Sequence, residues 1–107
     1  MKIWVDDVRP PVPVQNGQDE LYVWCKSVNE TKRAIIELTL TNEKVVSLID
    51  LDHDAGDYAE DGGDYIRILD WLEETGRNYP IRIHSANPVG VANMRRIIKR
   101  NGWTEVK

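Results

Sequence analysis

Three short segments of this 107-residue sequence hold the side chains best suited to chemistry. Residues 6–9 begin with two adjacent aspartates, residues 52–54 place a histidine between two aspartates, and residues 84–87 combine a histidine with serine and asparagine. His53 and His84 are the two histidines of the chain, and each lies in one of these segments. Carboxylates are preferred ligands of a hard cation such as Mg²⁺, and histidine exchanges protons near neutral pH. Such side chains, brought together, favour chemistry on a phosphate ester.

Each segment directly follows or ends an apolar run with the features of a β-strand. The run from Lys44 to Leu51 is almost continuously apolar, which favours a strand buried on both faces. The connection Val8–Glu20 contains three prolines and is predicted to be a loop. Strands are predicted at Lys2–Val5, Leu21–Cys25, Lys44–Leu51 and Ile81–His84, with a short fifth edge strand at Trp103–Val106.

A first helix is predicted after the second strand. Ser27-Val28-Asn29-Glu30 matches the capping box S-x-x-E, in which serine and glutamate bond reciprocally to backbone amides. The helix should run to about Leu38 or Leu40. The helix should bury an apolar side formed by Val28, Ile35, Ile36 and Leu38 or by their neighbours.

Two further helices are predicted in the second half of the chain. Tyr65–Thr75 has apolar residues spaced by three, and Gly76 is a typical helix stop. Asn87-Pro88 is a typical helix start, because asparagine caps the first turn and proline fits its first position. This last helix should reach Asn101-Gly102.

Alternating strands and helices predict an α/β fold with one parallel sheet covered on both faces, that is, a single doubly wound domain over residues 1–107. Its connections should be right-handed. In open parallel sheets, ligands bind outside the carboxyl ends of the strands. All three polar segments should therefore meet at one edge of the sheet.

This edge predicts a role for each polar side chain. A divalent metal, Mg²⁺ or Mn²⁺, should bind among carboxylates, with His53 and His84 moving protons in an order left open. Arg9 and the start of the last helix should hold an anionic substrate. The predicted metal ligands are Asp6, Asp7, Asp52 and Asp54, the catalytic residues are His53, His84 and Asp52, and the substrate-binding residues are Arg9, Ser85 and Asn87.

Charge is distributed unevenly along the chain. The formal net charge is −4, from 14 bases and 18 acids. Residues 50–64 contain seven acids and no base, whereas the residues from Arg82 on contain six bases and one acid. Those bases include Arg95, Arg96, Lys99 and Arg100 on the last helix, where they form either a solvated face or a contact for a phosphate backbone.

Other classes of protein and site are excluded by simple counts. No apolar stretch approaches the roughly 18 residues of a membrane helix, and the acidic start does not fit a signal peptide. One cysteine, Cys25, cannot form an internal disulfide, and it suits a buried position in a cytoplasmic protein. The spacing of aspartates from Asp50 resembles a calcium loop, but Ala55 and Asp61 stand where that loop needs glycine and glutamate.

Three motifs, IWVDDVRPP, LDHDAGD and IHSANPVG, closely resemble the cyclic-phosphate processing receiver-like domain, a branch of the response-regulator receiver superfamily. The resemblance extends from Lys2 to about Arg100. It implies the receiver sheet of five parallel strands in the order 2-1-3-4-5, here with a loop as first crossover and without the last helix. It also implies that Asp6 and Asp7 match the metal-binding acidic pair, Asp52 the phosphoacceptor and Ser85 the hydroxyl residue. The lysine-proline pair that typical receivers carry after the fifth strand is absent from the sequence.

The first functional hypothesis is a metal-assisted phosphoesterase that opens a cyclic phosphate on a small nucleotide or at an RNA end. Two alternatives stay open. One is a signalling domain phosphorylated on Asp52, and the other is a non-catalytic module that binds nucleotides or RNA ends. None of the three involves a membrane, and the missing lysine weighs against the signalling domain.

Overall fold

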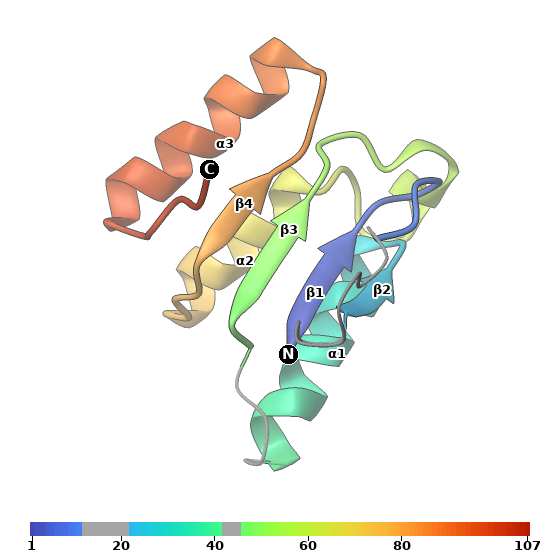
Figure 1. Ribbon diagram of the computed structural model, residues 1–107, viewed down its shortest axis with the longest axis vertical. Helices are drawn as coiled ribbons and strands as arrows, with labels where there is room; N and C mark the ends of the chain where they lie inside the picture. Colours follow the sequence, from blue (N-terminus) through green and yellow to red (C-terminus); the bar gives the residue numbers. More distant parts are fainter. Residues whose placement is uncertain (12–21, 42–45) are drawn as a thin grey trace, which may run out of the picture.

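A computed structural model describes residues 1–11, 22–41 and 46–107. Within them, four short parallel strands form one sheet in the order β2-β1-β3-β4, as Figure 1 shows. The strands are β1 (Lys2–Val5), β2 (Tyr22–Cys25), β3 (Leu48–Leu51) and β4 (Ile81–Ile83). The order matches the first four strands of the expected receiver sheet. The α/β class and the parallel sheet are therefore confirmed.

The expected fifth strand is not formed. Trp103–Val106 runs beside β4 but makes a single bridge, between Ile81 and Glu105. Two backbone hydrogen bonds hold it there: the amide of Ile81 donates to the carbonyl of Thr104 at 2.9 Å, and the amide of Val106 donates to that of Ile81 at 2.7 Å. One bridged residue is too short a pairing to count as a strand.

The helices are α1 (Val28–Thr41), α2 (Ile66–Thr75) and α3 (Pro88–Asn101), and a 3-10 helix, η1 (Gly56–Glu60), follows β3. No helix among the described residues is long and apolar enough to cross a membrane. The predicted caps of α3 and α2 are present: Asn87 accepts a 3.0 Å hydrogen bond from the amide of Gly90, and Gly76 ends α2 with a left-handed φ of 68°.

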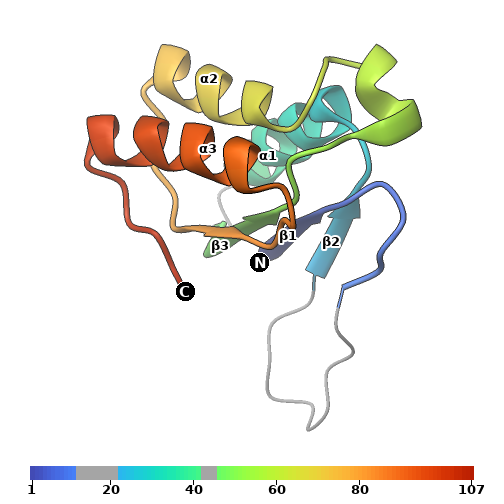
Figure 2. The same cartoon turned by 90° about the horizontal axis from the view of Figure 1, so that it is seen from above.

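All three helices lie on the same face of the sheet, with α2 packed between α1 and α3 (Figure 2). The expectation of helices on both faces is therefore wrong for the described residues. Right-handed connections explain the difference. The chain moves in one direction across the sheet from β2 to β3 to β4, so these crossovers share a face. The connection from β1 to β2 runs the opposite way, and most of the predicted loop Val8–Glu20 lies outside the described residues.

The hydrophobic core fills the space between the helices and this face of the sheet. Alternate strand residues such as Ile3, Val5, Ile49 and Leu51 point into it and are fully buried. The residues between them face the other way: the register places Trp4 beside Trp24 and Asp50, and Asp50 beside Arg82. All four residues of β3 are buried, as its apolar run predicted.

Some predicted boundaries and burials need correction. β3 begins at Leu48, which pairs with Lys2 of β1, and the described residues Val46 and Ser47 lie outside the strand; the predicted start at Lys44 lies outside the described residues. In α1, Val28 and Ile35 are buried as expected, but Ile36 is 39% exposed because it lies on the solvent side of the helix. Cys25 is buried, as predicted.

Candidate functional site

The carboxyl ends of the two central strands bring three aspartates together. Val5 and Leu51 are paired in register, and the amide of Asp52 donates a 3.0 Å hydrogen bond to the carbonyl of Val5. The residues that follow each strand are therefore neighbours in space. Asp6, Asp7 and Asp52 each offer a carboxylate oxygen, and these oxygens lie within 4.8 Å of one another. Asp54 is not part of this group.

Asp6 is the buried anchor of the cluster. Its Oδ1 accepts hydrogen bonds from the backbone amides of Val8 at 3.0 Å and Arg9 at 2.8 Å, which folds the chain tightly after β1. Burial alone would raise the pKa of Asp6, but these two amides and the side chain of His84 outweigh it and lower the pKa below its usual value. Asp6 is therefore a fixed negative charge.

Asp7 is in the opposite electrostatic situation. Burial, together with the negative charges of Asp6 and Asp52, raises the pKa of Asp7. Its carboxylate also lies directly against Gly56, where a side chain would collide with Oδ2. Gly56 has a φ of +55°, so glycine is favoured there by both the backbone and the space.

Arg9 is the main positive group at the edge of the cluster. Its guanidinium lies 3.4 Å from Asp6 Oδ2 and 3.6 Å from Asp52 Oδ2, while its side chain is 60% exposed. The indole of Trp4 donates a 2.7 Å hydrogen bond to the backbone carbonyl of Arg9 and fixes the main chain there. Among the described residues, the exposed guanidinium is thus held near the carboxylates by these long contacts, and it can turn towards an incoming anion.

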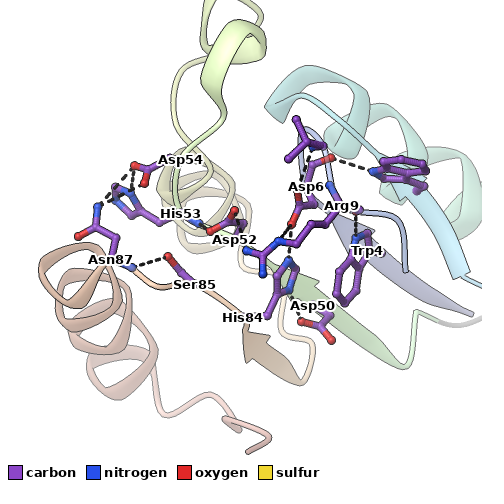
Figure 3. Close-up of polar contacts among 12 residues, drawn as sticks. Trp4, Asp6, Arg9, Asp50, Asp52, His53, Asp54, His84, Ser85 and Asn87 are labelled. Carbon is purple, nitrogen blue, oxygen red and sulfur yellow. Dashed lines mark hydrogen bonds and ion pairs between the residues drawn. The ribbon is translucent and has the colours of Figure 1, made fainter. Parts of the chain in front are cut away.

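His84 lies beyond the end of β4, on the face of the sheet without helices, and both of its ring nitrogens bind aspartates (Figure 3). Nδ1 is 2.6 Å from Asp50 Oδ1, and Nε2 is 3.0 Å from Asp6 Oδ2. The ring stacks on Trp4 with centroids 3.9 Å apart and an interplanar angle of 6°. Burial would lower the pKa of His84, but the hydrogen bonds to the two aspartates raise it above 6.5. His84 therefore joins two buried carboxylates, which favour its protonated form.

His53 lies in the turn after β3, and in Figure 3 it is on the opposite side of Asp52 from His84. Its Nδ1 is 2.8 Å from Asp54 Oδ1, and no described residue binds Nε2. Its ring packs on the first turn of α3, so closely that a Cβ on Gly90 would lie 2.8 Å from Nδ1. Asp52 Oδ1 accepts the amide of His53 at 2.7 Å, so both side chains are set by one turn.

Ser85 and Asn87 shape the loop between β4 and α3. Ser85 Oγ accepts the amide of Asn87 at 3.1 Å, and the side chain of Asn87 caps α3. The amide group of Asn87 also reaches Asp54 at 3.5 Å. The structure thus brings Asn87, Asp54 and His53 together, apart from the group of Asp6, Asp7 and Asp52.

Sequence reasoning missed three residues that build the site: Asp50, Trp4 and Gly90. Asp50 interrupts the apolar run of β3 and is 1% exposed, and a buried carboxylate in a strand needs a charged or hydrogen-bonding partner. That rule could have indicated Asp50 as the partner of a histidine. The contacts of Trp4 and Gly90 depend on packing between distant segments, and the sequence carries no comparable pattern for them.

The donor set fits a hard divalent cation. Three carboxylates from the ends of two strands converge, and burial together with the negative charges of Asp6 and Asp52 raises the pKa of Asp7. Oxygen ligands of this kind suit Mg²⁺ or Mn²⁺.

A family model described as the Cyclic-phosphate processing Receiver domain matches residues 1–100. No curated protein and no solved structure gives a significant match. The match spans the sheet, the three aspartates and both histidines. The chain belongs to the cyclic-phosphate processing receiver domain family, as the three motifs had indicated.

Proposed function

We propose that this domain is a metal-assisted phosphoesterase that hydrolyses a cyclic phosphate on a nucleotide or at an RNA end. The observation that carries the proposal is the convergence of Asp6, Asp7 and Asp52, with the backbone amide of His53 bound to Asp52 and Nε2 of His53 left without a partner among the described residues. Family membership supports the substrate class, because the family is described by cyclic-phosphate processing.

Asp7 and Asp52, with Asp6 behind them, would hold Mg²⁺ or Mn²⁺. When bound, such an ion neutralises the carboxylates and withdraws charge from a phosphoryl oxygen. Without positive charge the cluster would repel a phosphate, so Arg9, beside a bound ion, would make this edge attractive to the substrate. The guanidinium of Arg9 is placed to bind a non-bridging phosphate oxygen.

His53 supplies the proton transfer. A water oxygen bonds to phosphorus, the bond from phosphorus to one ribose oxygen breaks, and that oxygen leaves as a hydroxyl. Nε2 of His53 takes the proton from the water or gives one to the leaving oxygen, and Asp54 orients the ring through Nδ1. His84 has no free ring nitrogen, since Asp50 and Asp6 bind both, and we assign it to holding Asp6 in place.

The experiment incubates the purified chain with Mg²⁺ or Mn²⁺ and a 2′,3′-cyclic nucleotide and measures the nucleoside monophosphate formed. Replacement of a general acid or base costs about 10²- to 10⁴-fold, so His53→Asn should lose turnover to that extent. Asp52→Asn should lose it too, whereas the control Asp57→Asn, an exposed acid in η1, should not. Full turnover by His53→Asn, or no turnover with either metal, would refute the proposal.

One observation favours a second candidate. Asp52 follows β3 beside Asp6 and Asp7, which is the arrangement expected of a phosphoacceptor with its metal pair. A signalling domain of this kind would take a phosphoryl group from acetyl phosphate, measured as a mass increase that Asp52→Asn abolishes. Mass increase without hydrolysis of any cyclic phosphate would assign the domain to signalling.

A further inference from the structure

A groove of about 630 Å³ runs along α3 beside Ile83 at the end of β4. It lies outside the carboxylate cluster and is not used in the mechanism above. Its walls combine the small residues of the β4–α3 loop with one face of the helix. The lining residues are Ile83, Ser85, Ala86, Pro88, Val91, Ala92, Arg95, Arg96 and Lys99.

The groove is positively charged. Three of the described residues that line it are basic, and none of them is acidic. Arg95 is neutralised by Glu105 at 3.0 Å, but within the described part of the chain Arg96 binds the neutral side chain of Asn93, at 2.6 Å, and no acid. Lys99 is exposed and pairs with no acid in the described chain. Two cations are therefore available to an anionic ligand.

The groove begins at the candidate active site. Ser85 and Ala86 line the groove at the β4–α3 loop, and the same loop positions Asn87, which reaches Asp54 beside His53. From Pro88 to Lys99 the helix advances about 16 Å, at roughly 1.5 Å per residue. This exceeds the length of one nucleotide, because successive phosphates of a stacked strand are about 3.4 Å apart along its axis.

Charge also selects the direction in which a bound strand would leave the site. The loop and 3-10 helix after β3 expose Asp54, Asp57, Glu60 and Asp61, and in Figure 1 this segment lies on the opposite side of the carboxyl edge from α3. A phosphate chain is repelled by those acids and attracted by Arg96 and Lys99. It would therefore run along α3.

We propose that this groove binds the phosphodiester chain on the 5′ side of a terminal cyclic phosphate, so that the substrate is an RNA strand rather than a mononucleotide. The inference rests on the proposed function for the identity of the reacting end. Binding in the groove itself depends only on the phosphate chain and can be measured without turnover.

The test measures binding of a fluorescent octanucleotide RNA by anisotropy, with and without a 2′,3′-cyclic end, over a series of salt concentrations. The variant is Arg96→Gln/Lys99→Gln. The control is Arg33→Gln/Arg67→Gln, which removes the same charge from exposed positions of α1 and α2. Circular dichroism melting of all three proteins reports on folding.

Each phosphate contact with a single strand contributes about 0.7 to the slope of log K against log salt concentration, so loss of two contacts lowers the slope by about 1.4. The affinity of the groove variant should therefore fall on the order of 25-fold at about 0.1 M salt, and the loss should vanish near 1 M. The control should bind like the original chain. The preference in kcat/KM for the cyclic octanucleotide over the cyclic mononucleotide should shrink in parallel.

Equal binding by the groove variant and the control would overturn the inference, and it would leave the proposed function standing if mononucleotides are still hydrolysed. An acidic peptide that binds the groove as tightly as the RNA would also overturn it and indicate a protein partner. Groove-dependent RNA binding without hydrolysis of any cyclic end would uphold the groove as an RNA site and refute the proposed function.

Discussion

Gly90 gives the sharpest test of the proposed role of His53. In Gly90→Ala, the new Cβ would lie 2.5 Å from Cδ2 of the imidazole, whereas ordinary contact begins near 3.4 Å. The ring must therefore move by about 3.4 − 2.5 = 0.9 Å. A displacement of about 1 Å in a catalytic group can cost about 10²-fold in rate. We expect kcat for the cyclic nucleotide to fall by about that factor.

The free energy of unfolding should respond differently. Alanine is favoured over glycine within a helix by about 0.5–1 kcal/mol, and an imidazole forced off its rotamer costs about 0.5–1.5 kcal/mol. These effects oppose one another, so the free energy of unfolding should change by less than about 1 kcal/mol. The rate loss corresponds to about 2.7 kcal/mol, which stability alone does not explain.

The assay pairs initial rates at saturating metal with urea unfolding of the same preparations. The matched control is Val89→Ala, the preceding residue of α3, whose side chain is 70% exposed and outside the site. It should keep the original rate. A Gly90→Ala protein with the original kcat would show that the position of His53 against α3 has no part in the reaction. A fall of about 2.7 kcal/mol in the free energy of unfolding would instead indicate that the substitution acts through the stability of the fold.

Three further changes test the surrounding structure. Tyr65→Phe removes the 2.7 Å hydrogen bond from the buried phenol to the carbonyl of Lys26 and should lower the free energy of unfolding by about 1–3 kcal/mol, measured with urea. NMR titration should find that the pKa of His84 exceeds 6.5 and falls in Asp50→Asn. Because the pKa of His84 is raised in the folded state, protonation of His84 stabilises the fold fully below pH 6.5, and this contribution is lost as the pH rises through the folded pKa. Asp50→Asn should make the free energy of unfolding depend less on pH. Asp7→Asn should raise the melting temperature of the metal-free protein, because it relieves the repulsion between Asp7 and the carboxylates of Asp6 and Asp52. It should also abolish the change in melting temperature that Mn²⁺ produces. A variant whose melting temperature still responds to Mn²⁺ would exclude Asp7 as a ligand.

Local patterns were sufficient to predict most elements of the fold. Alternation, capping residues and glycine stops act within a few residues, and they located four strands and three helices to within a few positions. The number of covered faces was harder to predict, because it depends on the direction of each crossover. Given the order 2-1-3-4, the rule of right-handed connections places α1, α2 and α3 on one face. That consequence could have been drawn from the sequence, although the register itself could not.

The candidate site shows the same division between local and distant information. The sheet rule correctly placed Asp6, Asp7 and Asp52 at one edge, because paired strands end together. It could not distinguish the two histidines, since both follow strands. Their difference comes from residues far apart in the chain: Asp50 and Asp6 bind both nitrogens of His84, while Asp54 binds one nitrogen of His53.

The compensation of charge around the aspartates supports the proposal that Asp7 and Asp52 are the main ligands of a cation. Asp6 already has two amides, His84 and Arg9 as partners. Asp52 has one amide and a 3.6 Å contact with the exposed Arg9, and Asp7 has no cationic side chain bound to it in the described part of the chain. Negative charge that the protein leaves uncompensated attracts a cation from solution. The contact of His84 with Asp6 thus makes the metal proposal more specific, because it occupies the buried aspartate and leaves the two outer carboxylates for the ion.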